Sequence, residues 1–193
     1  MIFELLRAPF PAAYGEAILS LEECKAHLRV DGDDEDDLIA VFRDAAIDFV
    51  ERHCAVKLKF TVGIVWVADH FPRECRAALP LSMGPVTAIT KVTWLDRSGV
   101  EVNALPSTLR ITPRGDVLPA IGGAWPSNVG GDVSIEFTAG YADGAAPPGL
   151  LAAVRLFLGH LYKNREAVTD RGTEAEVPMG VMTLCAPHRR VLI

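Results

Sequence analysis

Residues 29–45 read RVDGDDEDDLIAVFRDA, an acidic run that changes abruptly into an apolar one. Six of the seven residues from Asp31 to Asp37 are acidic. An EF-hand calcium loop that begins at Asp31 requires Gly at its sixth position and Glu at its twelfth, where this chain has Asp36 and Phe42. Acidic side chains in a first helical turn are stabilised by the positive end of the helix dipole. The pattern therefore favours a helix start over a calcium site, and it is compatible with a solvated acidic contact surface.

The apolar residues after the acidic run recur every three or four positions, as on one face of a helix. They are Leu38, Val41, Phe42, Ala45, Ala46, Phe49 and Val50. This spacing predicts a helix over about 34–53, with Arg43 and Asp44 on its polar side.

Two more helices are predicted on either side of this one. Ser20 and Glu23 have the spacing of a capping box, which predicts a short helix over 21–28. Residues 147–167 again show helical spacing, and two prolines at the start suit a first helical turn. A further short helix is expected in the C-terminal tail.

Between the second and third helices the apolar residues alternate with polar ones, as in strands. Residues 1–19 are expected to form an extended arm. The predicted β segments are 59–69 with Phe60, Val62, Ile64 and Trp66 on one side, a short strand at 75–81, a hairpin of 86–95 with 100–102, two short segments at 109–111 and 117–121, and a strand at 132–143 with Val133, Ile135 and Phe137 on one face.

The order of these segments predicts an α+β fold. We expect a small helical bundle of three main helices plus a short C-terminal helix, with a β-rich insertion between the second and third main helices. A single domain would span residues 1–193. Its helical part would comprise about 20–56 and 147–167, its β insertion about 58–140, and its C-terminal tail about 168–193.

Composition narrows the possible functions. The 193 residues carry a net charge of −6, with a pI of about 5.4. Tight DNA binding depends on Lys and Arg that neutralise phosphates, so this balance argues against a DNA-gripping protein but not against one that DNA merely passes. No run is long and apolar enough to predict a membrane span, and no secretion signal is visible at the start. The scattered cysteines favour free thiols in a reducing compartment; they are Cys24, Cys54, Cys75 and Cys185.

Few patterns suggest chemistry at a site. Cys24 and His27 lie three positions apart on one predicted helix, and His53 precedes Cys54, but no second well-spaced pair completes a metal site. His160 has no evident catalytic partner. We therefore predict no catalytic residue, no metal and no cofactor.

Two stretches, taken in order, resemble the head–tail connector, or adaptor, proteins of long-tailed bacteriophages. The first runs from Leu19 to Leu58: a Leu-Ser-Leu-Glu-Glu helix, an LRVDG-type loop, an Asp-Leu-Ile helix start and a Phe-Val-Glu-Arg helix end. The second contains a strand that ends in Phe-Thr-Ala-Gly-Tyr at Tyr141, followed by a proline-initiated helix. The closing segment from Leu184 is also similar to the family's Leu-x-x-Pro-Tyr-Arg, with His188 at the Tyr position. Related proteins occur in phage-derived gene transfer agents, and both origins remain open.

The resemblance implies a structural, non-enzymatic role. Adaptors of this class assemble as a ring, usually of twelve copies, beneath the portal, join the capsid to the neck or tail, and leave a channel for DNA. The expected partners are other copies of the chain, the portal protein and a downstream neck, stopper or tail protein. DNA would pass without specific binding, and no membrane would be involved. The expected location is the neck of a virion or virus-like particle, with synthesis in the bacterial cytoplasm.

The resemblance also suggests candidate contact residues. The C-terminal segment of such adaptors commonly reaches toward the portal, which makes the following residues candidates for that contact: Pro187, His188, Arg189, Arg190, Val191, Leu192 and Ile193. We further hypothesise that Asp33, Asp34 and Asp36 face the lumen or a neighbouring subunit, since acidic channel walls would keep DNA from sticking.

Two hypotheses from other classes remain. The first is a monomeric ligand- or carbohydrate-binding module that uses Trp66, Trp94 and Trp125 as a platform. The second is an unrecognised hydrolase that uses His160 or a Cys–His pair, which would require a concave pocket with converging polar groups.

Overall fold

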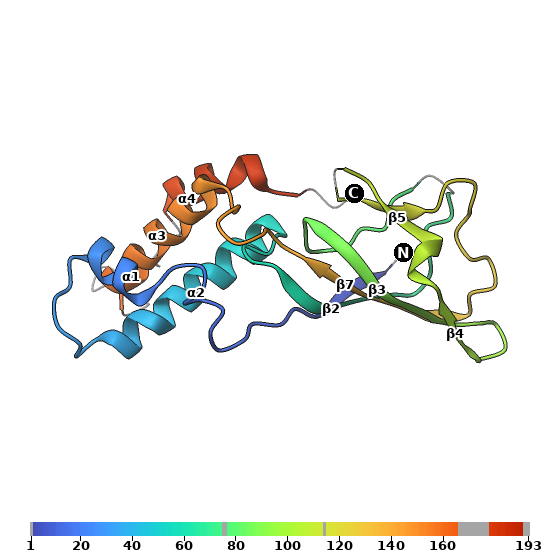
Figure 1. Cartoon of the computed structure of the whole chain (residues 1–193), viewed down its shortest axis with the longest axis horizontal. Coiled ribbons are helices and arrows are strands. Elements are labelled where there is room, and N and C mark those ends of the chain that lie inside the picture. The colour runs from blue at the N-terminus through green and yellow to red at the C-terminus, as the bar shows by residue number, and fades with distance from the viewer. Residues whose placement is uncertain (1, 75–76, 114, 166–177, 191–193) are drawn as a thin grey trace, which may run out of the picture. The chain divides into compact units, whose positions relative to one another are not determined.

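The structure is a computed structural model that describes residues 2–74, 77–113, 115–165 and 178–190. Within them the chain forms four α-helices and strands that pair antiparallel, so the predicted α+β class is confirmed. The chain divides into two compact units (Figure 1). We call the described residues of Pro11–Lys59 and Ala142–Arg190 the helical unit, and residues 2–10 and 60–141 the β unit.

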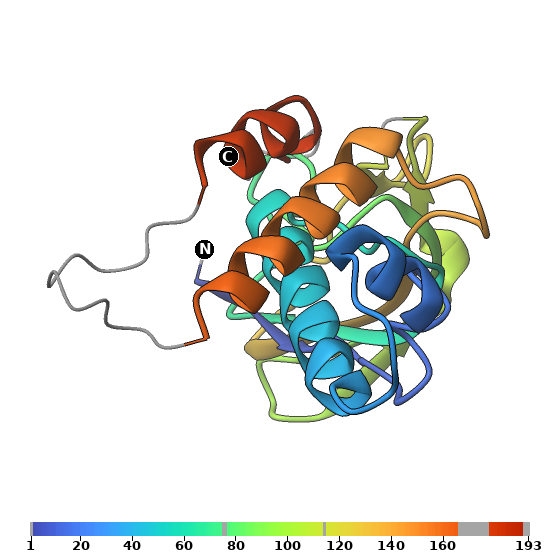
Figure 2. The same ribbon diagram turned by 90° about the vertical axis from the view of Figure 1, so that its left-hand side faces the viewer.

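The helical unit contains α1 (Leu21–Leu28), α2 (Asp36–Cys54), α3 (Pro148–Lys163) and α4 (Met179–Cys185), followed by a 3-10 turn, η2 (Ala186–His188). Figure 2 shows α3 beside α2, and α4 packs against α3. The capping box predicted for α1 is present: the Ser20 hydroxyl accepts from the backbone N–H of Glu23 at 3.2 Å, and the Glu23 carboxylate accepts from the backbone N–H of Ser20 at 3.0 Å. The predicted bounds of the first helix are confirmed.

The buried face of α2 differs from the predicted one. Its fully buried apolar residues are Ile39, Ala46, Ile47 and Val50, whereas Val41 is 63% exposed. Arg43, predicted on the polar side, is buried. Its guanidinium pairs with Glu16 and with Asp44, at 2.9 Å for the latter. A buried ion pair of this kind allows a polar residue to sit at an inward helix position, which a count of apolar residues does not anticipate.

The β unit contains a five-stranded sheet in the order β1-β2-β7-β3-β4 and a two-stranded sheet, β5-β6 (Figure 1). The strands are β1 (Phe3–Arg7), β2 (Thr61–Ala68), β3 (Val86–Leu95), β4 (Glu101–Ala104), β5 (Leu109–Ile111), β6 (Val117–Pro119) and β7 (Gly131–Ala139). The predicted β3–β4 hairpin and the alternation of β7 are confirmed; Val133, Ile135 and Phe137 are fully buried.

The β2 prediction was correct for only half of the strand. Ile64 and Trp66 are fully buried, but Phe60 and Val62 are 52% and 61% exposed. The pairing of β2 with β7 is irregular between Thr61 and Ile64, and Gly63 lies there with φ +70°. An extra residue in a bulge moves the following side chains to the other face of the sheet, which breaks the alternation.

Two other β expectations need correction. Part of the predicted extended arm is β1, which pairs antiparallel with β2 as an edge strand of the sheet. The predicted strand at 75–81 is absent from the described part of that segment, residues 77–81, where Leu79 forms only an isolated bridge to Val117. The sheet thus gains a strand at its edge that the alternation of the short N-terminal segment did not reveal.

A buried ion pair stands at the C-terminal end of α2. The Glu51 carboxylate accepts from Lys57 Nζ at 2.6 Å, from the Tyr14 hydroxyl at 2.5 Å and from the backbone N–H of Leu58 at 2.8 Å. The Glu51 and Lys57 side chains are only 1% and 2% exposed. Burial raises the pKa of Glu51, while the contacts with Lys57, Tyr14 and Leu58 oppose that rise. The carboxylate therefore connects the end of α2 to Tyr14, which lies before α1, and to the irregular segment with Lys57 and Leu58 that follows α2.

Replacing Glu51 by Gln is expected to destabilise the protein by roughly 3–5 kcal/mol, because it leaves the Lys57 ammonium buried without its counter-ion. Urea unfolding followed by circular dichroism measures this change. Asp48→Asn is the matched control on the same helix: its partner Arg52 is 75% exposed, so the expected loss is below about 1 kcal/mol. Equal midpoints for the two variants would contradict a central role for Glu51.

Candidate assembly surfaces

The acidic loop before α2 is partly neutralised within its own unit. Lys25 Nζ, on α1, lies 2.9 Å from both the Asp33 and Asp36 carboxylates, and the Lys25 side chain is only 10% exposed. Hydrogen bonds to Asp33 and then Asp36 raise the pKa of Lys25, and Lys25 in turn lowers the pKa of Asp33. A lowered carboxyl pKa stabilises the fold above the ordinary Asp pKa, and this contribution is lost as pH falls through the lowered value. Two of the three candidate acids thus help to dock α1 on the loop.

The other acids of the run behave differently. Asp34 is exposed and forms no ion pair with any described residue. Glu35, the residue before α2, accepts from the Tyr162 hydroxyl and from Arg165 at 2.6 Å, both near the end of α3. Hydrogen bonds from Tyr162 and then Arg165 lower the pKa of Glu35. The loop is therefore connected to α1 and α3, and Asp34 is the candidate acid that remains available at the surface.

The C-terminal segment is held against α2 up to its last described residue. The backbone N–H of Arg190 donates to the Cys54 carbonyl at 3.0 Å, and the Cys54 thiol donates to the Cys185 carbonyl at 3.7 Å. Burial raises the pKa of the Cys54 thiol to about 12. Pro187 and Arg189 are exposed, and His188 lies close to Gly149 at the start of α3. Three of the candidate tail residues, Val191, Leu192 and Ile193, lie outside the described residues.

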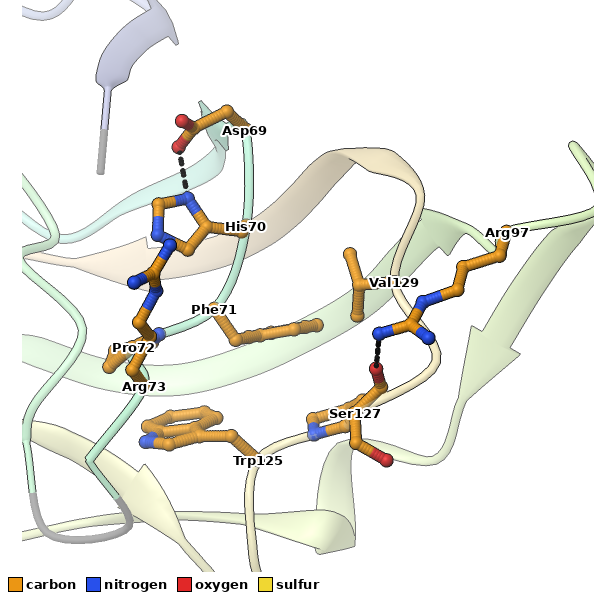
Figure 3. Close-up of a pocket in the computed structure, with 10 residues that line it drawn as sticks. Asp69, His70, Phe71, Pro72, Arg73, Arg97, Trp125, Ser127 and Val129 are labelled. Atoms are coloured by element: carbon orange, nitrogen blue, oxygen red, sulfur yellow. Dashed lines mark hydrogen bonds and ion pairs between the residues drawn. The ribbon is translucent and has the colours of Figure 1, made fainter.

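One hollow of the β unit gathers aromatic and basic side chains (Figure 3). It has a volume of about 530 Å³. Phe71 and Trp125 stack with ring centres 5.5 Å apart, His70 pairs with Asp69 at 2.7 Å, and Arg97 donates to the Ser127 carbonyl at 3.3 Å. The aromatic rings belong to the core of the unit and are largely buried. The polar groups at its rim form separate pairs, His70 with Asp69 and Arg97 with Ser127. They do not converge on one point, as a hydrolase site would require.

The tryptophans do not form the platform required by the carbohydrate hypothesis. Trp66 is fully buried, and Trp94 and Trp125 are 9% and 8% exposed. The Nε1 groups of Trp94 and Trp125 donate to the backbone carbonyls of Asn128 and Ala77. Rings in a sheet core stabilise the fold and cannot stack on a sugar.

The residues considered for metal or catalytic chemistry are separated or buried. Cys24 is fully buried, and burial raises the pKa of its thiol to about 11. His27 is exposed, and His160 stacks on Phe157 with ring centres 6.0 Å apart. Among the described residues no group of three or more His, Cys, Asp or Glu side chains could hold a metal ion. Cys75 lies outside the described residues.

Two surface features were not found from the sequence. One is a groove between the end of α1, α3 and the start of α4, and the other is a groove along the edge strand β1. Each combines exposed apolar side chains with charges of one sign. The residues of each groove come from segments distant in the sequence, so sequence patterns did not predict the grooves. The only patterns found near them were the capping box of α1 and the amphipathic spacing of the helices.

Comparisons with known proteins were made for the sequence and for the fold. Residues 18–92 match the family described as Phage gp6-like head-tail connector protein. No curated protein is significantly similar to the chain. No helix in the described part of the chain is long and apolar enough to cross a membrane.

Solved structures match the whole chain. A chain in the neck of an empty GTA particle computed with C6 symmetry is 27% identical, with a TM-score of 0.69. A chain in the virion of a native gene transfer agent (GTA) particle is 26% identical, with a TM-score of 0.71. A chain in the neck of a native GTA particle computed with C12 symmetry is 25% identical, with a TM-score of 0.70. Each match covers 100% of this chain and 97% of the other.

Asp36→Asn is expected to lower the free energy of unfolding by about 1 kcal/mol, because it weakens the anchor of the nearly buried Lys25 ammonium. Asp34→Asn is expected to change it by less than about 0.5 kcal/mol, as at an unpaired surface site. Urea unfolding of both variants separates the two roles within the acidic loop. A larger loss for Asp34→Asn than for Asp36→Asn would contradict this assignment.

Proposed function

Since the chain resembles the head–tail connector proteins of bacteriophages and gene transfer agents in sequence and in fold, we propose that it is a structural adaptor of a virion neck. In this proposal twelve copies form a ring beneath the portal, join it to a downstream neck, stopper or tail protein, and leave a channel for DNA. The protein acts by binding other proteins and carries out no reaction.

One observation carries the proposal: the whole chain has the fold of chains found in gene transfer agent necks, at 25–27% identity. Those necks were computed with C12 and C6 symmetry, and both symmetries are compatible with twelve copies around one axis. Identical subunits in a closed ring contact each other through two different surfaces, head to tail. The adaptor proposal therefore requires two complementary faces on this chain.

We infer that the C-terminal segment from Pro187 contacts the portal. Its anchored part ends with Arg190 bonded to the end of α2, and Arg189 presents an exposed positive charge. The residues beyond, Val191 to Ile193, are apolar in sequence. A fixed base followed by a short basic and apolar end suits a contact with a second protein.

The acidic balance of the chain supports a channel that DNA passes without specific binding. Because DNA affinity depends on the number of phosphates that Lys and Arg neutralise, a net charge of −6 disfavours retention of DNA. Asp34 is the candidate acid best suited to face a lumen or a neighbour, since Asp33 and Asp36 already pair with Lys25. Synthesis in the bacterial cytoplasm, before incorporation into the particle, is part of the same proposal.

Cryo-electron microscopy of particles from the producing cell tests the adaptor role. We expect twelve copies of this chain between portal and tail. Particles whose neck lacks the chain would contradict the proposal, and a ring with a different number of copies would contradict the stoichiometry.

A truncation after Arg190 tests the portal contact separately. It removes Val191, Leu192 and Ile193 but keeps the bond from Arg190 to Cys54, so the unfolding midpoint is expected to remain unchanged. The yield of tailed particles should fall at least tenfold, measured by particle counting in micrographs. Ile121→Gln is a matched control, because it removes an apolar side chain that is 93% exposed in the β unit. Normal yield from the truncated chain would rule out a contribution of these three residues to the proposed portal contact.

A further inference from the structure

The groove of the helical unit carries positive charge. It has a volume of about 710 Å³ and is lined by the end of α1, by α3 and by the start of α4. Arg29 and Lys163 are both exposed along it, and His27 and His160 also line it. No Asp or Glu is among the described residues that line it. We call it the basic groove.

The two strong bases of the basic groove have no counter-ion among the described residues. Other bases of the same unit do have carboxylate partners within 4 Å: Lys25, Arg43, Arg52, Lys57, Lys59, Arg155 and Arg165. In a chain of net charge −6, two bases on one groove that have no carboxylate partner among the described residues make the groove suited to an anionic binding partner. Because these seven bases are paired, a general excess of unpaired positive charge over the helical unit does not explain the groove, although Arg189 also lacks a carboxylate partner among the described residues.

The basic groove also contains apolar side chains, and these indicate which kind of anionic partner it would bind. Leu156 lines it and is 45% exposed, Leu28 is half-buried there, and the adjacent Met179 is 84% exposed. A phosphate backbone offers no apolar surface to such side chains, whereas a polypeptide with acidic and apolar side chains matches both features. The groove therefore favours an acidic, apolar protein surface over nucleic acid.

The β unit of the same chain presents a surface of that kind. A groove of about 590 Å³ follows the edge strand β1. Ile2 and Leu6 line it with exposed fractions of 80% and 64%, and the exposed Glu4 and Asp132 form no ion pair with described residues. Among the described residues that line it there is no Lys or Arg. We call it the acidic groove.

We propose that the basic groove of one copy binds the β1 edge and acidic groove of the next copy. This inference rests on the adaptor function proposed above, and it assigns the two faces that a head-to-tail ring needs. The faces are different surfaces on different units, so the contact is heterologous and can close into a ring. Arg29 and Lys163 would meet Glu4 and Asp132, while Leu156 would cover Ile2 and Leu6. Complementary charges of this kind fix the register of an interface and exclude wrong partners.

Zero-length carbodiimide cross-linking of intact particles tests the contact with native residues. The carbodiimide activates a carboxylate, and a lysine amine in contact with it then forms an amide while the carbodiimide, having taken up the water that the condensation releases, leaves as a urea. We expect mass spectrometry to find Lys163 joined to Glu4 or Asp132 of another copy. A mixed particle population made from ¹⁵N-labelled and unlabelled chains identifies the link as intermolecular. Lys163→Arg is the matched control: it keeps the positive charge but removes the amine that forms the link.

Charge reversal gives an independent functional measure. Lys163→Glu is expected to lower the particle yield at least tenfold, because it places a carboxylate opposite Glu4 and Asp132. The double variant with Glu4→Lys should recover most of that loss. Both variants change exposed side chains, so their unfolding midpoints should stay near that of the unchanged protein.

The possible outcomes distinguish the inference from the adaptor proposal. Lys163 joined to a different protein, or to Asp170, Glu174 or Glu176 of its own chain, would overturn the inference and identify another occupant of the basic groove. Absence of any link in particles that contain the ring would also overturn it while leaving the adaptor role intact. Particles without this chain in the neck would overturn the adaptor role itself.

Discussion

The contact on which the rest of the helical unit depends is the buried carboxylate of Glu51. It satisfies the Lys57 ammonium, the Tyr14 hydroxyl and the backbone N–H of Leu58 at once. A buried charge is tolerated only when it is paired and fully hydrogen-bonded, so these partners specify one another's positions. Within the described residues, the chain passes between its two units next to Pro11, Lys59 and Ala142. The Tyr14 hydroxyl oxygen also accepts from the backbone N–H of Lys59, and Lys59 pairs with Asp143. The residues beside all three passages are thereby held within the helical unit.

The same principle operates, with less burial, at the other end of α2. The Lys25 pair with Asp33 and Asp36, and the Glu35 contacts with Tyr162 and Arg165, connect the acidic loop to α1 and α3. The acidic run, which in the sequence resembles a binding site, therefore serves largely to hold α1 and α3 in place. The charges that have no ion-pair partner among the described residues stand out for that reason. In the helical unit they include Asp34 on the loop and Arg29 and Lys163 on the basic groove, and these are the positions where a second molecule has most to gain.

A protein that works by assembly is consistent with this division of charges. The thiols of Cys24, Cys54 and Cys185 are buried, and burial raises the pKa of each one, so they behave as core residues. The tryptophans lie in the core of the β unit. Exposed apolar side chains occur at several places on both units, including β1 and the residues around α4. Contiguous exposed apolar surface with charged borders is typical of protein–protein contact sites.

Local patterns in the sequence were sufficient for the helices, the β3–β4 hairpin and the resemblance to connector proteins. Ser20 and Glu23 determine the start of α1 because a capping box involves only neighbouring residues, and Val133, Ile135 and Phe137 show the period of a strand buried on one face. The inward face of α2, the reversed alternation at Gly63 and the pairing of β1 depended on partners distant in the chain. Arg43 could be placed inward only once Glu16 met it, and Lys25 could be recognised as the counter-ion of Asp33 only after α1 had packed beside the loop. The two grooves could not be predicted for the same reason, because each is lined by side chains from separate segments. Short-range periodicity is a property of the chain itself, whereas charge pairing and groove shape arise only when remote segments are brought together.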